Sequence, residues 1–153
     1  MDVRQRAVNY LNIKPRTCMQ VKKYLSGKGC SDEEILEAVK ELEEYHYIDD
    51  RRYCRLYFEY GFEKGRGIAR IKRELGEKGI SRDIIESEYE ELAEVPDQFE
   101  MALVIGEDMI RGVDMEALEY EERGKLKAKI GRRLMTRGFS PEVAYKVIGA
   151  LIK

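Results

Sequence analysis

Three segments of the chain repeat the same order of residues, and this repetition limits the folds available to it. The second segment follows the first by 50 residues (Gly29 to Gly79), and the third follows by 59 (Gly79 to Gly138). Equivalent positions carry the same residue type: Leu25, Leu75 and Leu134; Gly29, Gly79 and Gly138; Ser31, Ser81 and Ser140; Leu42, Leu92 and Leu151. Such a period is typical of stacked helical units that bury apolar surface against their neighbours. The longer second interval predicts an insertion within residues 112–123.

Each repeated glycine lies in a break between two helical patterns. The serine that follows it precedes acidic residues, in the sequences SDEE, SRD and SPE. Serine caps the free amides at a helix start, and acids suit the positive end of the helix dipole. Ser31 and Glu34 have capping-box spacing, and Pro141 suits a first helical position. Glycine suits the left-handed residue that ends the preceding helix.

These signals predict an all-α chain, because no segment shows the period-two alternation of a strand. Each repeat is expected to hold three helices. The predicted first helices span 3–12, 51–62 and 98–110; the second, basic helices span 17–27, 67–78 and 124–136; the third span 32–45, 82–93 and 141–152. A short additional helix is predicted at 114–122, and Val95-Pro96 marks the last junction. The repeats are assigned to residues 1–48, 49–95 and 96–153.

The second helices share a pattern of cations at helical spacing. The equivalent positions are Arg16, Gln20 and Lys23; Arg66, Arg70 and Arg73; and Lys125, Lys129 and Arg132. Helical projection places Arg66, Arg70 and Arg73 nearly opposite the apolar stripe, and it predicts Leu126 in the core beside Lys127. We interpret the pattern as a surface for an extended anionic partner. The alternative is the ordinary solvated face of an amphipathic helix.

The distribution of charge limits the classes of partner that the chain could bind. Charged residues make up 38% of the chain, but its net charge is only −2. Basic stretches at residues 64–82 and 123–137 alternate with an acidic stretch at 32–50. A general nucleic-acid binder is usually basic overall, so any DNA contact must come from local patches. Acidic and basic helices that neutralise one another would explain part of the same alternation.

Residues that could support catalysis are few. His46 is the only histidine, and Asp49-Asp50 lacks a nearby third ligand, so the pair is interpreted as charging a helix start rather than as a metal site. The basic loop at 64–67 lacks the ending of a phosphate-binding loop. We expect no enzymatic activity, no metal and no cofactor.

Cysteines and aromatic residues indicate structure rather than chemistry. The three cysteines form no CxxC pair, which favours reduced thiols in a cytoplasmic protein, with Cys18 in the core. No apolar run reaches membrane-spanning length. Tyr53 and Tyr57, four residues apart, are predicted to form one packing face.

The assembled motifs resemble the RecX family, the regulators of the RecA recombinase. The resemblance is strongest over residues 47–81, YIDDRRYCRLYFEYGFEKGRGIARIKRELGEKGIS, and good at RGFS, residues 137–140. It is looser over residues 94–122. Cys54 stands where the family usually has a small alanine, which should have little effect.

This resemblance implies three tandem three-helix repeats in an extended, curved molecule. It also implies binding in the groove of the RecA–DNA filament, which would limit filament growth, strand exchange and coprotease activity. A monomer with weak affinity for single- and double-stranded DNA is expected. The expected filament contacts are Arg16, Lys23, Arg66, Arg70, Lys72, Arg73, Lys78, Lys125, Lys129, Arg132, Arg133 and Arg137. The first repeat should contribute least, because Gln20 interrupts its pattern.

Two other classes of function remain alternatives. Two short helices about a glycine turn also suit a DNA-binding module of the helix-turn-helix type. The acidic starts of the third helices at residues 32 and 82 disfavour it, since a recognition helix must approach phosphates. A metal-dependent nuclease would require more metal ligands than the sequence offers.

Overall fold

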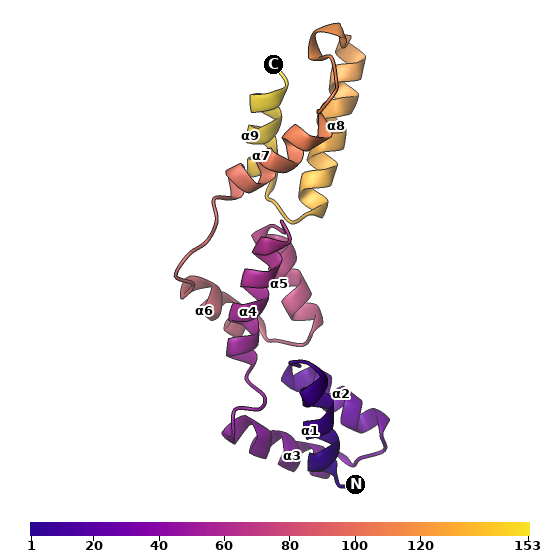
Figure 1. Ribbon diagram of the computed structural model, residues 1–153, viewed down its shortest axis with the longest axis vertical. Helices are drawn as coiled ribbons and strands as arrows, with labels where there is room; N and C mark the ends of the chain where they lie inside the picture. Colours follow the sequence, from indigo (N-terminus) through magenta and orange to yellow (C-terminus); the bar gives the residue numbers. More distant parts are fainter. The chain divides into compact units, whose positions relative to one another are not determined.

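The computed structural model describes residues 1–153 and contains only helices (Figure 1). The elements are α1 (Val3–Ile13), α2 (Cys18–Gly27), α3 (Asp32–Glu44), α4 (Asp50–Glu63), α5 (Ile68–Glu77), α6 (Arg82–Glu90), α7 (Gln98–Met109), the 3-10 helix η1 (Met115–Ala117), α8 (Tyr120–Thr136) and α9 (Pro141–Leu151). This confirms the all-α prediction. None of these helices is both long and apolar enough to cross a membrane.

The predicted helix starts after the repeated glycines are confirmed. The hydroxyl oxygens of Ser31, Ser81 and Ser140 accept hydrogen bonds from backbone amides three residues later, at 3.2, 3.4 and 3.1 Å. The capping box predicted for α3 is present, because its third residue also bonds back to the Ser31 amide. The glycines that precede these caps have φ values of 84°, 91° and 99°, which disfavour residues with a Cβ.

Three predicted helix extents differ from the structure by more than one residue. Helix α8 begins at Tyr120, not at residue 124, and the helix predicted at 114–122 is reduced to the single turn of η1. Glu119 and Glu122 form a capping box that starts α8 early. Helix α6 ends at Glu90, three residues before the predicted end. Glutamates crowd this end, where the helix dipole opposes negative charge.

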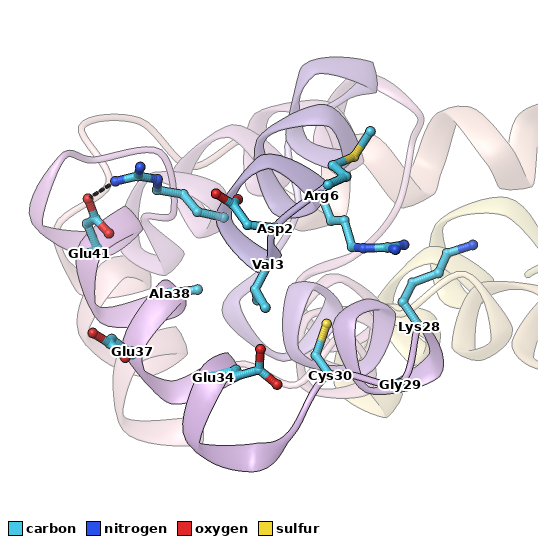
Figure 2. A pocket seen from close by; sticks show the side chains of 12 residues that line it. Asp2, Val3, Arg6, Lys28, Gly29, Cys30, Glu34, Glu37, Ala38 and Glu41 are labelled. Carbon is cyan, nitrogen blue, oxygen red and sulfur yellow. Dashed lines mark hydrogen bonds and ion pairs between the residues drawn. The ribbon is translucent and has the colours of Figure 1, made fainter.

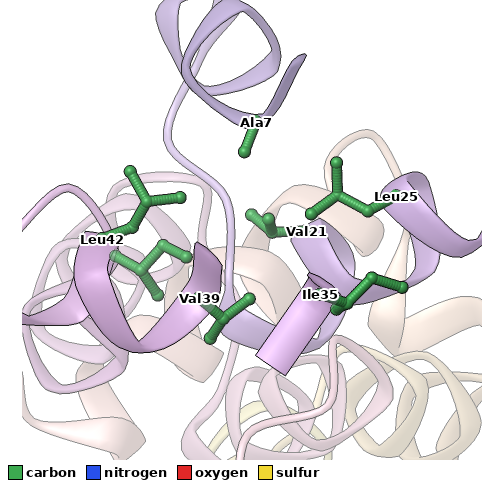
Figure 3. Packing of buried hydrophobic residues seen from close by; sticks show 7 residues of the cluster. Ala7, Val21, Leu25, Ile35, Val39 and Leu42 are labelled. Atoms are coloured by element: carbon green, nitrogen blue, oxygen red, sulfur yellow. The ribbon is translucent and has the colours of Figure 1, made fainter. Parts of the chain in front are cut away.

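The chain forms two compact units: residues 1–57 with 74–92 (unit 1), and residues 58–73 with 93–153 (unit 2). The core of unit 1 includes buried residues from α1, α2, α3 and the segment after α3, all but the last of them labelled in Figure 3: Ala7, Val21, Leu25, Ile35, Val39, Leu42 and Ile48. Cys54, Leu75, Ile80 and Ile85 are also buried in this unit. Leu25, Leu75 and Leu42 stand at positions where the sequence repeats a leucine.

Unit 2 has its own core, built around α7, α8 and α9. Its buried cluster consists of Ala102, Ile130, Leu134, Phe139, Ala144, Val147 and Ile152. Leu126 packs against this cluster and Lys127 is exposed, as predicted. The boundaries proposed for the three repeats stay a prediction.

Candidate binding surface on the basic helices

Helix α8 carries the most accessible group of the predicted cations. Lys125, Lys129, Arg132 and Arg133 are exposed, whereas Ile130 and Leu134 between them are fully buried. No acidic residue follows Glu122 in this helix. The 3.6-residue period separates the two sets, so that one side of α8 anchors the core and the other presents positive charge to solvent.

Arg123 fixes the first turns of α8. Its guanidinium donates hydrogen bonds to the backbone carbonyls of Leu118, Met115 and Lys153, at 3.2, 2.8 and 2.9 Å. One side chain thus joins the helix start to the 3-10 turn and to the last residue of the chain. The contacts hold the backbone that precedes Lys125.

The cations of α5 lie in a more enclosed setting. Arg66 is half-buried, with its guanidinium carbon 5.2 Å from the centre of the Tyr60 ring. Arg70 and Lys72 are also half-buried, and only Arg73 is exposed. All four cations have interaction partners within the structure. Arg66 and Arg70 project away from the apolar stripe of α5, but the expectation that they are accessible to a partner is therefore wrong.

The reason lies at the start of α5, which packs against the turn between α8 and α9. The Gly67 amide donates to the Arg137 carbonyl at 2.8 Å, and the Ala69 amide donates to the Gly138 carbonyl at 3.2 Å. A Cβ at Gly138 would lie 2.3 Å from the Cβ of Arg70. Arg137 itself is half-buried, and its Nε is enclosed without a hydrogen-bond partner.

In unit 1, an aromatic ring covers the first predicted cation. Arg16 is half-buried, and its guanidinium carbon lies 4.1 Å from the centre of the Tyr10 ring. Tyr10 in turn stacks on Tyr24, with ring centres 4.0 Å apart. The Nε of Arg16 is enclosed and has no hydrogen-bond partner. This arrangement is typical of a side chain that packs between elements.

Gln20 interrupts the basic pattern for a structural reason. Its side-chain oxygen accepts the Thr17 amide at 2.9 Å, while the Thr17 hydroxyl oxygen accepts the Gln20 amide at 3.2 Å. The pair forms the capping box of α2. A lysine or arginine at this position has no acceptor atom and could not close the box.

The remaining predicted cations of unit 1 lie among carboxylates. Lys78 is half-buried, with its Nζ 5.3 Å from the centre of the Tyr57 ring, whereas Lys23 is exposed. Both line a pocket of about 400 Å³, whose walls are Met19, Gln20, Lys23, Tyr57, Glu74, Glu77 and Lys78. The mixed charge makes this pocket a weaker site for an anion than α8.

Comparison with known proteins identifies the family of this chain. A model described as "RecX, first three-helix domain" matches residues 4–42, and one described as "RecX, second three-helix domain" matches residues 49–87. The "Regulatory protein RecX" of Haemophilus influenzae strain PittEE is 31% identical over 143 residues, which cover 93% of this chain and 90% of that protein. The chain belongs to the RecX family.

Other RecX proteins agree with this assignment. The "Regulatory protein RecX" of Lactobacillus johnsonii is 31% identical over 150 residues, which cover 96% of this chain but 52% of that relative. The chain thus spans about half the length of this relative. The crystal structure of RecX from Lactobacillus salivarius matches with a TM-score of 0.81 at 25% identity, over 97% of this chain and 94% of that one. These relatives are named as regulatory proteins, and the solved RecX structure shares the fold of this chain.

One RecX position has a structural role that the sequence did not indicate. The Asp50 carboxylate accepts the Cys18 amide at 2.9 Å and so caps α2, although Asp50 belongs to α4. Burial raises the pKa of Asp50. Asp49 caps α4 instead, through the Arg52 amide at 3.1 Å. Sequence spacing within one helix cannot reveal a cap that joins residues 32 positions apart.

Two cysteines of this RecX chain, Cys18 and Cys54, lie in settings that disfavour reactivity. Cys18 is half-buried and packs against the core of unit 1, in agreement with the prediction, and its thiol donates to Glu43 at 3.4 Å. Burial and this hydrogen bond raise the pKa of Cys18 to about 11. Burial also raises the pKa of Cys54 to about 12. Both thiols are therefore protonated at neutral pH, a state that disfavours nucleophilic reactivity.

The structure also places the two paired tyrosines of α4 and the only histidine. Tyr53 and Tyr57 are half-buried and stack with ring centres 6.0 Å apart, which confirms their shared packing face. His46 is exposed, in a left-handed conformation with φ 61°. No group of three or more His, Cys, Asp or Glu side chains comes together in a way that could hold a metal ion.

Proposed function

We propose that this chain regulates the RecA recombinase by binding in the groove of the RecA–DNA filament. There it would limit filament growth, strand exchange and coprotease activity in DNA repair. Membership of the RecX family supports the choice of partner. The observation that carries the mechanism is the exposed cationic side of α8, which has no acid after Glu122.

The charge distribution supports an assembled filament over free DNA as the ligand. Lys125, Lys129 and Arg132 provide positive charge on one helix, but α3 presents exposed acids such as Glu33 and Glu37. These acids repel free phosphate backbones, while a filament offers both protein and DNA surface. Displacement of counterions from phosphates makes such binding fall as salt rises. The proposal includes a cytoplasmic, monomeric protein with weak affinity for DNA alone.

The helix-turn-helix alternative has less support. A recognition helix places its first turn at the base edges of the major groove. The first turn of α3 contains Asp32, Glu33 and Glu34, and that of α6 contains Asp83. Carboxylates at these positions would meet the phosphates that border the groove. A duplex of defined sequence and its scrambled counterpart should accordingly bind with equal, low affinity.

Co-sedimentation tests the proposal directly. The chain is centrifuged with RecA filaments assembled on single-stranded DNA, with RecA lacking DNA, and with DNA alone. We expect the chain to pellet with filaments and to remain mostly in the supernatant with DNA alone. A parallel assay of RecA ATP hydrolysis should show inhibition. Equal pelleting with DNA in the absence of RecA would refute the proposal.

Charge reversal then locates the contact. Reversal of Arg70 together with Arg73 would confuse binding with folding, because the Arg70 backbone packs against Gly138. Arg73→Glu alone avoids this problem, since Arg73 is exposed. The matched control is Lys40→Glu, which reverses an exposed cation on α3. We expect Arg73→Glu to weaken filament inhibition and Lys40→Glu to leave it unchanged, with equal helical circular dichroism in both.

A further inference from the structure

Every fourth residue from the middle of α8 to its cap is a cation. This row, called the α8 row below, consists of Lys125, Lys129, Arg133 and Arg137, and no acid lies between them in the sequence. Successive members are about 6 Å apart along the helix axis. Like charges four residues apart destabilise a helix, and the helix dipole favours cations only in the last turn. The stability of α8 therefore does not explain Lys125 and Lys129.

The repeated scaffold does not require such a row. The equivalent positions that begin in α5 carry Arg66, Arg70, Glu74 and Lys78. Those that begin before α2 carry Arg16, Gln20, Tyr24 and Lys28. Glu74 breaks the row in α5. In α2, Gln20 closes a capping box and the Tyr24 ring stacks on another tyrosine. An uninterrupted row of four cations is thus specific to α8.

The side chains of the α8 row have no anionic partner in the structure. Lys125, Lys129 and Arg133 are exposed and form no ion pair. The Arg137 guanidinium forms no hydrogen bond, and its Nε is enclosed. Arg16 also has an enclosed Nε, but its guanidinium lies over an aromatic ring. A buried donor without an acceptor costs folding free energy. Acceptors for the accessible nitrogens of Arg137 must therefore come from outside the chain.

A second basic segment, distant in sequence, lies at the end of the α8 row. The Gly67 amide donates to the Arg137 carbonyl at 2.8 Å. A Cβ at Gly65 would lie 4.0 Å from Nη2 of Arg137, so the guanidinium is next to the loop at residues 64–66. Lys64 in this loop is exposed, with its Nζ 5.8 Å from the centre of the Tyr60 ring. Packing within unit 2 thus continues the row from Arg137 to the loop that carries Lys64.

The acids that flank these segments in the sequence do not interrupt the row. Glu122 precedes it and is engaged in the capping box at the start of α8. Glu142 follows it and pairs with Lys146 of α9 at 3.4 Å. Glu59 and Glu63 of α4 project about 140° and 100° away from the direction of Lys64 around the helix axis. The side of unit 2 that carries the α8 row therefore keeps a positive potential.

The largest group of cations around a pocket in unit 1 differs in this respect. A pocket of about 490 Å³ beside the start of α1 is lined by Arg4, Arg6 and Lys28 (Figure 2). Its wall also carries acids, and Arg4 pairs with Glu41 at 2.6 Å. Asp2 and Glu34 line the same pocket and accept backbone amides at the starts of α1 and α3. Charges of both signs compensate one another there, so the pocket does not select an anion.

The side of α8 that carries the row also indicates the kind of anion. Met135 is the exposed large apolar residue nearest to the row, but it projects about 120° from Lys129 and about 160° from Arg133. A protein partner needs an apolar anchor at the centre of the interface. A phosphate backbone is bound by charge and hydrogen bonds without one. Cations at regular intervals also suit a strand of repeating charges better than a single small anion.

We propose that the α8 row, together with Lys64, binds the sugar–phosphate backbone of a DNA strand. Lys125 and Lys129 neutralise phosphates along the helix, and the Arg137 guanidinium donates to a phosphate at its end through two parallel hydrogen bonds. This assignment rests on the proposed function and adds that α8 contacts the DNA of the filament rather than RecA. Contacts to phosphates alone give a weak, salt-dependent affinity for free DNA.

A matched pair of lysine variants tests the row. Lys129→Gln removes a member of the row, whereas Lys127→Gln removes an exposed lysine that projects about 160° away on the same helix. Both variants change the net charge equally. Binding to a fluorescent oligothymidylate is measured by anisotropy over a series of salt concentrations. Lys129→Gln should weaken binding several-fold and reduce the magnitude of the salt slope by about one. Lys127→Gln should behave as the parent. Equal effects of the two variants would overturn the assignment.

Competition and an arginine variant test the chemistry of the ligand. Polyglutamate of the same charge should displace the oligothymidylate poorly, and equal displacement would show that the row binds acidic protein instead. Arg137→Lys keeps the charge but loses the planar pair of donors. It should weaken binding with little change in the salt slope, and unchanged affinity would remove Arg137 from the site. The lysine pair still decides the assignment if Arg137→Lys does not fold.

The same lysine variants separate this assignment from the proposed function. If the chain does not pellet with RecA filaments but Lys129→Gln still binds oligothymidylate more weakly than Lys127→Gln, the proposed function fails and the phosphate row stands. If the chain pellets with filaments and the two variants are equal on filaments and on oligothymidylate, the phosphate row fails and the proposed function stands.

Discussion

Helices α5 and α8 carry cations at equivalent positions, but they present them differently. In α5, Arg66 and Arg70 are half-buried and interact within the structure. In α8, Lys125, Lys129 and Arg132 are all exposed. The difference arises because the start of α5 contacts the turn at residues 137–139, between α8 and α9. Helix α8 begins at Tyr120, so its first cationic position, Lys125, already lies inside the helix. Equal spacing in the sequence therefore does not give equal access to a partner.

The two helices consequently support different roles. Arginines at the α5 junction serve packing with their aliphatic portions and keep only part of their charge available. The α8 cations remain hydrated and can exchange water and counterions for phosphate or carboxylate groups. The comparison predicts that α8 contributes most of the binding. It also predicts that disruption of the contact between the start of α5 and the turn at residues 137–139 mainly lowers stability. Four substitutions test it.

The largest expected effect comes from Gly138→Ala, at the junction itself. The residue has φ 99°, and the new Cβ would lie 2.3 Å from that of Arg70. Backbone strain and overpacking together should cost on the order of 3 kcal/mol of unfolding free energy. Denaturant titration followed by circular dichroism measures the loss. The matched control is Gly131→Ala in α8, where the nearest atom is an ordinary 3.6 Å away. A variant at 138 as stable as the parent would contradict the observed close approach.

The next effect concerns binding by α8. The triple variant Lys125→Glu/Lys129→Glu/Arg132→Glu should weaken filament binding on the order of 100-fold, if each lost contact contributes about 1 kcal/mol. The plot of log affinity against log salt should become less steep, with the magnitude of its negative slope reduced by about three if all three cations contact phosphates. Co-sedimentation over a series of salt concentrations gives both quantities. A larger loss from Arg73→Glu than from the triple variant would reverse the ranking of the two helices.

A smaller effect is expected from Arg123→Ala, which removes the donor to three backbone carbonyls. The loss should be about 2 kcal/mol, because the bonds are charge-assisted but partly accessible to water. Hydrogen exchange should accelerate selectively at residues 115–126 and near the chain end. Arg111→Ala is the control, since Arg111 is exposed and pairs only with Asp108 nearby, at 3.1 Å. Unchanged exchange in Arg123→Ala would show that the helix start is held by other contacts.

The smallest effect is a gain in stability from Gly124→Ala. The site lies within α8, and a Cβ there would meet nothing within 4 Å. Replacement of glycine by alanine in a helix interior should stabilise the protein by about 0.5–1 kcal/mol. Thermal unfolding measures the change. If α8 truly begins at Tyr120, the midpoint rises; a fall would indicate that residue 124 is not helical in solution.

Much of the fold could be predicted because its signals are local. Ser31, Ser81 and Ser140 each bond to an amide three residues away, so that the sequence neighbourhood contains the whole interaction. The early start of α8 was missed because a Glu119–Glu122 capping box is a weaker signal than a serine cap. The site was predicted less well. Access to Arg70 depends on Gly138, which is distant in sequence.

The sequence alone determined the all-α class, the repeated order of helices, their caps and the positions of the cations. These properties depend on period, composition and neighbours within one helical turn. The tertiary structure decided which cations are accessible and why Asp50 caps α2. Such properties depend on close approach between segments far apart in the chain. A helical period gives the direction of a side chain around its own axis, but only packing determines what lies in that direction.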